Sequence, residues 1–242
     1  LGISAVVRHI FLDQQVAVRQ GRDLRVRHLA ALLLLADEIL PAVAAVFIKE
    51  DFMQNKKQEW RPGNMLYPVP AVMVSCQREN EKPNIITVAW AGTICSDPVM
   101  LSISVRKERY SHRIISETKE FVVNLTTKDL CRATDYCGVR SGRDVDKFKE
   151  MNLTPQKSSK INAPAIAESP VNIECKVVNV IELGSHDMFI AKVEAVHVDE
   201  KLLDDKGRLR LEDANLLAYS HGEYFELGEK IGKFGFSVAK KK

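Results

Sequence analysis

The sequence predicts a mostly β-structured fold with short helices, built as an antiparallel barrel. Apolar and polar residues alternate over several segments of strand length. In residues 99–106, for example, Val99, Leu101, Ile103 and Val105 share one face. These segments follow one another without the regular strand–helix alternation of a parallel sheet. Six or so strands at this spacing therefore indicate an antiparallel barrel.

The expected strands differ in length and in which faces they bury. They cover residues 71–75, 84–90, 99–106, 121–125, 172–183 and 188–198. In the second of them, Ile86, Val88 and Trp90 lie on one face, opposite Ile85, Thr87 and Ala89. Residues 184–187, Gly-Ser-His-Asp, have the composition of a hairpin turn between the last two strands.

Three helices are expected in the gaps between strands. One covers residues 111–118, and a second covers residues 128–137 behind Thr127 as its cap. A third begins at Ser141, with an acidic residue three positions on as in a capping box. The third helix is expected to bury Val145, Phe148 and Met151.

Composition excludes several classes of function. The 242 residues are 45% hydrophobic and carry a formal net charge of +3, which is too small to indicate nucleic-acid binding. The five cysteines form no repeated C-x-x-C spacing, so free thiols in a reducing, cytoplasmic compartment are expected. Six scattered histidines show no metal-ligand spacing, and no metal site is expected.

Residues 1–52 differ in character from the rest of the chain. Their apolar run, 29–36, is far too short for a bilayer, which needs about 20 residues, so no membrane span is expected. Residues 49–53, Lys-Glu-Asp-Phe-Met, can be encoded by a purine-rich ribosome-binding sequence followed by a start codon. We interpret residues 1–52 as a non-native extension translated from upstream sequence, with residues 53–242 as the domain. The alternative is a genuine helical extension.

One junction carries the residue types of an anion site. A strand ends and a helix begins at Ser104, Arg106, Lys107, Arg109, Tyr110, Ser111 and His112. Cationic side chains, hydroxyls and the free amides of a helix N-terminus together bind phosphate. The alternative is a solvated, charged turn. Residues 141–148, Ser-Gly-Arg-Asp-Val-Asp-Lys-Phe, open another helix and can bring Lys147 toward the same anion, or form only a well-capped helix.

Several segments, taken in order, resemble the flavin reductase-like FMN-binding family, and its flavoredoxin branch in particular. The segments are NIITVAWAG at 84–92, Asp97-Pro98, SVRKERYSH at 104–112, EFVVN at 120–124, SGRDVDKF at 141–148, GSHDMFIAKV at 184–193 and the C-terminal Tyr219 with GEYF at 222–225. Together they span about residues 60–236. The resemblance implies an FMN-binding split β-barrel that forms a homodimer, with FMN near the subunit interface.

The resemblance also assigns candidate roles to residues. The flavin ring is expected beside Thr87, Val88, Ala89 and Trp90, although Trp90 can equally be a barrel-core aromatic. The phosphate is expected at Arg106, Tyr110, Ser111 and His112, with Ser104 at the same junction and with Ser141, Lys147 and Phe148 closing over the cofactor. His186 matches a histidine near the flavin or the nicotinamide and is the catalytic candidate; the alternative is a solvent-exposed turn residue.

The function implied is an oxidoreductase that passes a hydride from NAD(P)H to flavin and on to an acceptor. For such hydride transfer the protein must position the flavin and the nicotinamide, stabilise the charge of the reduced flavin and exclude water. It does not need an acid–base pair of side chains. Two alternatives need the same FMN site: an electron carrier that does not oxidise nicotinamide directly, and a non-catalytic flavin-binding protein. The acceptor is expected to be a redox partner protein or a small molecule.

Overall fold

The computed structural model describes residues 57–239, so the predicted extension at residues 1–52 lies outside the described residues. The chain divides into two compact units, residues 1–63 and 64–242. The strands and helices that the structure describes belong to the second unit.

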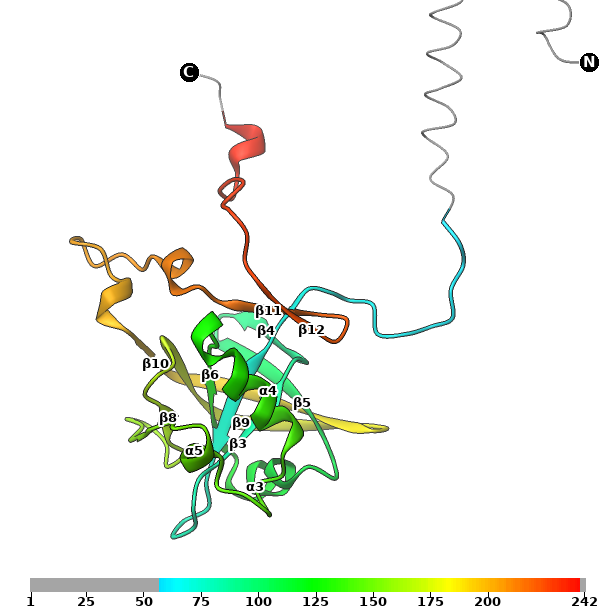
Figure 1. Cartoon of the computed structure of the whole chain (residues 1–242), viewed down its shortest axis with the longest axis vertical. Helices are drawn as coiled ribbons and strands as arrows, with labels where there is room; N and C mark the ends of the chain where they lie inside the picture. The colour runs from blue at the N-terminus through cyan, green and yellow to red at the C-terminus, as the bar shows by residue number, and fades with distance from the viewer. Residues whose placement is uncertain (1–56, 240–242) are drawn as a thin grey trace, which may run out of the picture. The chain divides into compact units, whose positions relative to one another are not determined.

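The centre of this unit is a seven-stranded antiparallel sheet (Figure 1). Its strands lie in the spatial order β3-β2-β6-β9-β10-β5-β4. Their bounds are Val72–Cys76 (β2), Asn84–Val88 (β3), Ala91–Ser96 (β4), Val99–Arg106 (β5), Glu120–Asn124 (β6), Val171–Leu183 (β9) and His186–Val198 (β10). This sheet confirms the predicted antiparallel, mostly β-structured fold.

The sheet curls because its two edge strands are consecutive in the chain. β3 and β4 lie at opposite ends of the strand order, yet only the bend at Ala89 and Trp90 separates them. The backbone amide of Ser104 in β5 donates to the carbonyl of Trp90 at 2.8 Å, which ties the bend to the far side of the sheet. The result is a half-barrel in which β3 faces β5 across a split.

Apolar side chains fill the half-barrel as the alternation predicts. Leu101, Ile103 and Val105 of β5 are buried in its core with Ile86 and Val88 of β3. Val99, at the start of β5, is 52% exposed, because the strand begins outside the packed region. Since about 25 cal/mol is gained per Å² of apolar surface removed from water, this interior is the main stabilising term of the fold.

Three α-helices pack on strands β2 and β3 (Figure 1). They are Tyr110–Thr118 (α3), Cys131–Val139 (α4) and Lys147–Glu150 (α5), and the 3₁₀ turn Lys128–Leu130 (η1) leads into α4. α3 contributes Ile114 and Ile115 to the barrel core, whereas α4 and α5 cover the outer face of β3 at Ile85. β3 is therefore buried on both faces.

Smaller elements complete the unit. A three-stranded sheet has the order β1-β11-β12, and a two-stranded one joins β7 to β8. The bounds are Val69–Pro70 (β1), Pro155–Gln156 (β7), Ala165–Ile166 (β8), Leu217–Ser220 (β11) and Glu223–Glu226 (β12), with 3₁₀ turns at Glu200–Leu202 (η2), Leu211–Ala214 (η3) and Phe236–Val238 (η4).

The start of the third helix and the two expected caps differ from the prediction. The third helix begins at Lys147 rather than Ser141, because residues 141–144 form a turn in which Ser141 Oγ accepts from the amide of Arg143 at 3.2 Å. Its cap is Asp146, whose carboxylate accepts from the amide of Lys149. Thr127 precedes a 3₁₀ turn and makes no side-chain capping bond.

The strand ends near the site also differ from the prediction. His186 is the first residue of β10 and pairs with Leu183, so the hairpin turn is only Gly184 and Ser185. Gly184 has a φ of +32°, which a side chain would disfavour. β3 ends at Val88, and the two residues after it form the bend.

Residues 57–239 contain no helix long and apolar enough to cross a membrane. Within the same residues, His, Cys, Asp and Glu side chains form no group of three or more that could hold a metal ion. All five cysteines are free thiols.

Glu174 is a fully buried carboxylate that anchors the loop at residues 157–163 to β9. It accepts from the amides of Ser159 and Lys160, both at 2.7 Å, and bonds the His197 ring at 2.6 Å. Although burial alone raises the pKa of a carboxyl, these partners hold the pKa of Glu174 below its ordinary value of 4.5.

We expect Glu174→Gln to lower the free energy of unfolding at pH 7 by about 2 kcal/mol, because the buried network loses its negative charge and one of its two acceptor oxygens. A depressed native pKa contributes stability above pH 4.5 that is lost as the pH falls through the native value. The difference between variant and wild type should therefore shrink below pH 4.5 in urea titrations. A difference that stays constant with pH would contradict this assignment.

Candidate functional site

Two adjoining cavities lie where β3, β5 and the start of α3 meet. The first, which we call the strand cavity, measures about 140 Å³. The second, the arginine cavity, measures about 300 Å³. Ile86 and Arg109 line both, so the two cavities are neighbours that share part of their walls.

The strand cavity occupies the split between β3 and β5. It is lined by Ile86, Thr87, Val88, Ala89, Trp90, Ser104, Val105, Arg106, Arg109 and His186. The Thr87 hydroxyl donates to the carbonyl of Thr134 in α4, and the Val88 side chain is buried in the barrel core. These two residues therefore present mainly backbone to the cavity. Because β3 is an edge strand, its outer amides and carbonyls are not paired by another strand of the sheet.

The polar side chains of the strand cavity come from β5 and β10. His186 pairs in register with Arg106, which places the two side by side. The hydroxyl of Ser185 lies 2.8 Å from Nδ1 of His186. Burial, together with the charge of Arg106, holds the pKa of His186 below its ordinary value, so the ring is neutral at pH 7.

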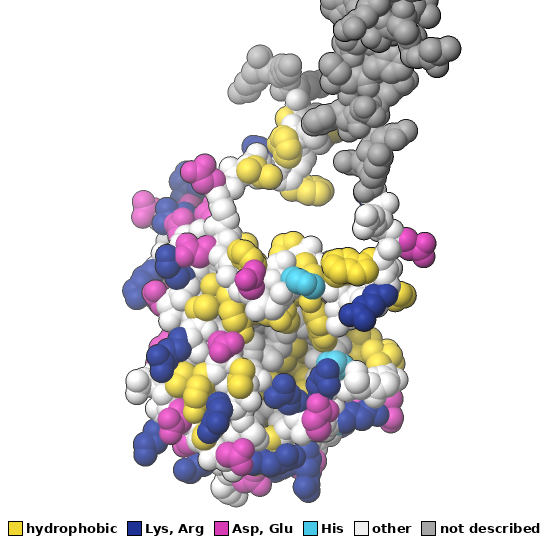
Figure 2. All heavy atoms as spheres, turned by 45° about the vertical axis from the view of Figure 1, so that its right-hand side comes forward, with side chains coloured by type: hydrophobic (Ala, Val, Ile, Leu, Met, Phe, Trp, Pro, Cys, Tyr) yellow, Lys and Arg dark blue, Asp and Glu magenta, His cyan; other side chains and the backbone are white. Residues whose placement is uncertain are grey.

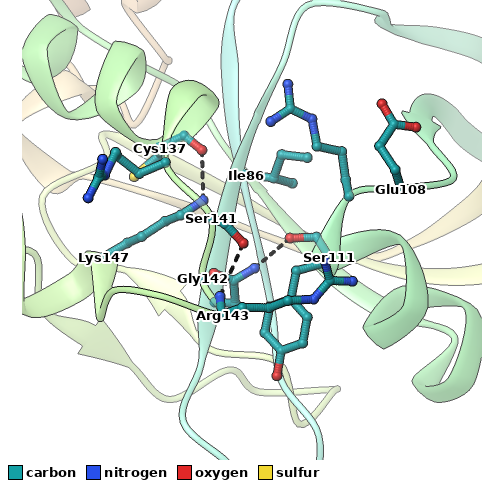
Figure 3. Close-up of a pocket in the computed structure, with 12 residues that line it drawn as sticks. Ile86, Glu108, Ser111, Cys137, Ser141, Gly142, Arg143 and Lys147 are labelled. Carbon is teal, nitrogen blue, oxygen red and sulfur yellow. Dashed lines mark hydrogen bonds between the residues drawn. The ribbon is translucent and has the colours of Figure 1, made fainter.

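The arginine cavity is built around the start of α3 (Figure 3). Arg109 is the N-cap of this helix and makes no side-chain capping bond, and the first turn contains no acidic residue. Arg109, Arg140 and Arg143 all line the cavity, and within the described residues none has a carboxylate within 4.0 Å. The acidic lining residue, Glu108, pairs with Arg106 at 3.5 Å. A helix N-terminus surrounded by unpaired arginines attracts an anion.

The wall of this cavity depends on close packing at Gly142. Asn84 Nδ2 donates to Ser111 Oγ at 2.7 Å, and both side chains are buried (Figure 3). A Cβ at position 142 would lie only 1.9 Å from Asn84 Oδ1. Gly142 therefore lets the turn at residues 141–144 rest on the starts of β3 and α3.

Lys147 is a buried lysine at the edge of the arginine cavity. Its Nζ donates to the carbonyl of Ile85 at 2.6 Å and to the carbonyl of Cys137 at 2.8 Å. Figure 3 shows the second of these bonds. Burial lowers its pKa to about 8. Lys147 thus ties α5 to β3 and to the end of α4, and it contributes a positive charge to the cavity floor below that pH.

Most of the predicted site residues are brought together. Those of the flavin-ring set, with Ser104, Arg106 and His186, line the strand cavity, and Tyr110, Ser111, Ser141 and Lys147 line the arginine cavity. Arg106 thus lies in the strand cavity rather than beside Ser111.

Two predicted residues lie outside both linings. His112 bonds Asp187 at 2.8 Å and packs edge-on against Phe189, so its ring is committed to holding α3 against β10. Although burial raises the pKa of a carboxyl, His112 and Lys107 hold that of Asp187 below its ordinary value. Phe148 is buried beneath α4 with Ile85.

Sequence reasoning missed Asn84 and Arg140, and it did not select Arg109 or Arg143 as cofactor residues. Arg109 and Arg143 stand within the two segments that were examined as anion sites, so their residue type was the available signal. Arg140 and Asn84 have no such signal, because their contribution depends on the position of α4 and of the turn that follows it.

The chain is similar to one known protein family and to several solved structures. A model of the family described as "Flavin reductase like domain" matches residues 64–228. The solved flavoredoxin of Desulfovibrio vulgaris is 32% identical, with a TM-score of 0.71 over 76% of this chain and 100% of that one. An FMN-binding protein from Thermus thermophilus is 26% identical, with a TM-score of 0.62 over 74% of this chain and 98% of that one. An uncharacterized protein of Archaeoglobus fulgidus is 32% identical over 58% of this chain and 78% of its own length.

Proposed function

Because this chain belongs to the flavin reductase-like family, with flavoredoxin among its structural relatives, we propose that it binds FMN across the two cavities and transfers electrons from NAD(P)H to an acceptor. The family membership confirms the resemblance that the sequence predicted, and the chain is a flavin-binding redox protein. FMN as the flavin, its position and NAD(P)H as the donor belong to the proposal. The observation that carries the proposal is that the two neighbouring cavities share Ile86 and Arg109 as lining residues.

The arginine cavity fits the terminal phosphate of FMN. The dianion would accept bonds from the free amides of α3 and from the Ser111 hydroxyl, with Arg109 and Arg143 supplying charge. Arg–phosphate bonds are charge-assisted and stronger than neutral ones. The cavity also contains Glu108, which would be unfavourable beside phosphate, but Arg106 pairs with this carboxylate at 3.5 Å and offsets its charge.

The strand cavity fits the polar edge of a flavin ring. Thr87, Val88 and Ala89 would offer backbone amides and carbonyls at the end of the edge strand β3, and the small Ala89 permits close approach. Arg106 and the neutral His186 lie opposite, on β5 and β10. Bound flavin supplies the ring that accepts and releases electrons, and preorganised donors at its edge stabilise the negative charge of the reduced form.

Each side chain has a defined task in this proposal. Arg106 contributes the positive charge next to the ring, and His186 contributes a single hydrogen-bond donor because it is neutral at pH 7. Trp90 covers the cavity from the bend and excludes water. His186 is in this sense the proposed catalytic residue. The homodimer, the redox partner or small-molecule acceptor, and the cytoplasmic location remain predictions.

We expect the purified protein to be yellow and its flavin absorbance to bleach when NADH or NADPH is added without oxygen. Stopped-flow absorbance would measure the rate for each nucleotide. A yellow protein that reacts with neither nucleotide, but is reduced by a redox partner protein, would support the electron-carrier alternative instead. A colourless protein that cannot be reconstituted with FMN would contradict the whole proposal.

A further inference from the structure

Five aromatic side chains form a continuous group that begins at the strand cavity. We call this group the aromatic wall. Its members are Tyr67, Trp90, Tyr219, His221 and Tyr224. Tyr67 lies with its ring centre 6.2 Å from that of Trp90, 6.1 Å from Tyr219 and 6.1 Å from His221, and Tyr219 lies 5.6 Å from Tyr224.

The small sheet and its hairpin position the wall. Tyr219 of β11 pairs with Val69 of β1 on one side and with Tyr224 of β12 on the other. His221 and Gly222 form the two-residue turn, with φ values of +50° and +95°, so His221 adopts a left-handed conformation that most residues avoid. The Tyr224 hydroxyl reaches Asp135 of α4 at 3.3 Å and fastens the hairpin to the barrel.

The wall is not part of a closed hydrophobic core. None of the five side chains belongs to the buried clusters; His221 is exposed and the other four are half-buried. Figure 2 shows hydrophobic side chains and histidines next to one another on one face of the molecule. Aromatic rings held at these separations present faces and edges on which another planar ring can pack.

The chemistry at the near end of the wall is cationic. Trp90 lines the strand cavity together with Arg106, Arg109 and His186. The Arg106 side chain is 53% exposed, and its carboxylate partner, Glu108, lies at the long distance of 3.5 Å. A molecule that reaches this end of the wall therefore meets an aromatic surface on one side and guanidinium groups on the other.

We infer that the aromatic wall and Arg106 form a reactant site for a planar aromatic carboxylate, which would lie against Trp90 and Tyr67 with its acid group toward Arg106. The ring would gain stacking and apolar contact, and the carboxylate would gain a charge-assisted bond. This inference rests on the proposed function, because the site adjoins the cavity assigned to the flavin ring. It names the class of small molecule that reaches that cavity.

Three probes of similar size test separately whether the ligand needs an aromatic ring and whether it needs a negative charge. Benzoate has the ring and the charge, cyclohexanecarboxylate has only the charge, and benzamide has only the ring. We expect benzoate to perturb the flavin absorbance of the FMN-loaded protein with an affinity at least about tenfold higher than that of either other probe. Equal affinity for all three probes, or no binding of benzoate, would overturn the inference. So would binding of NADH or NADPH that benzoate fails to weaken by competition.

Two variants and a control test the wall itself. Tyr67→Leu and Tyr219→Leu lie on different segments, and each should lower benzoate affinity about fivefold with FMN affinity within about twofold of wild type. The control is Phe225→Leu, because Phe225 is 47% exposed on the same hairpin and stands outside the wall. An equal loss in the control would show a general effect of the hairpin and overturn the inference.

The test distinguishes its own failure from failure of the proposed function. If the wild-type protein cannot be loaded with FMN, the proposed function is wrong and the inference falls with it. If FMN binds normally and benzoate does not, the inference alone is wrong.

Discussion

Replacing Arg109 by alanine should weaken FMN binding about 10- to 100-fold. Arg109 occupies the N-cap position of α3, lines both cavities and has no carboxylate within 4.0 Å among the described residues. A hydrogen bond to a charged group contributes about 1.5–3 kcal/mol, and about 1.4 kcal/mol corresponds to a tenfold change in affinity. Binding would be measured by titrating FMN with the apoprotein and monitoring the quenching of flavin fluorescence.

Arg113 provides a matched control on the same helix. Its side chain is 75% exposed and pairs with Glu117 at 2.7 Å, outside both cavities. We expect Arg113→Ala to leave FMN affinity within about twofold of wild type, because an exposed ion pair contributes little. If Arg109→Ala also binds FMN normally, the phosphate does not lie at the start of α3.

Replacing Arg106 tests whether this side chain acts at the phosphate or beside the flavin ring. The resemblance implies that Arg106 lies at the phosphate, whereas Arg106 lines the strand cavity, which our proposal assigns to the flavin ring. Arg106→Ala should therefore change the reduction rate of bound flavin more than the affinity for FMN.

The strands of the barrel could be predicted because their pattern is local. In β5, for example, apolar residues alternate with polar ones, and this pattern predicts which side chains enter the core. β4, Ala91–Ser96, was missed because five of its six residues are half-exposed or exposed small or polar residues, leaving no apolar alternation. β1, β11 and β12 have two to four residues each and are too short for a periodic signal.

The site was predictable where one segment supplies several lining residues. Residues 87–90 and the start of α3 are such segments: the family resemblance placed the first beside the flavin ring, and the residue types of the second indicated an anion site. His112 and Phe148 stand within the same motifs, yet each side chain turns toward another element, to Asp187 and to Ile85 respectively. The direction of a side chain at a strand–helix junction depends on tertiary packing, which a linear motif does not contain.

The turn at Gly142 shows how such packing fixes the site. Asn84 begins β3, Ser111 begins α3, and Gly142 belongs to the turn before α5, so three distant segments meet at one point. The Ser111 hydroxyl bonds the Asn84 amide, and the backbone at Gly142 lies directly over that amide. The position of the helix N-terminus and the position of the arginine-bearing turn therefore depend on the same contact.

Gly142→Ala should consequently reduce both stability and FMN affinity. The added Cβ would lie 1.9 Å from Asn84 Oδ1, so either the turn must move outward or Asn84 must release Ser111. Overpacking of this kind costs about 1–3 kcal/mol, and a buried amide without its partner costs about as much. We expect the free energy of unfolding, measured in guanidinium chloride without FMN, to fall by about 2–3 kcal/mol, and FMN affinity to fall about tenfold.

Gly92→Ala is the control, because a Cβ on Gly92 in β4 would meet nothing within 4 Å. Its unfolding free energy should stay within about 0.5 kcal/mol of wild type, as at other exposed positions. A Gly142→Ala protein with wild-type stability but weakened FMN binding would mean that the turn moves freely and only the phosphate contacts depend on it. Loss of stability with unchanged FMN affinity would instead show that the turn supports the fold without forming the phosphate site.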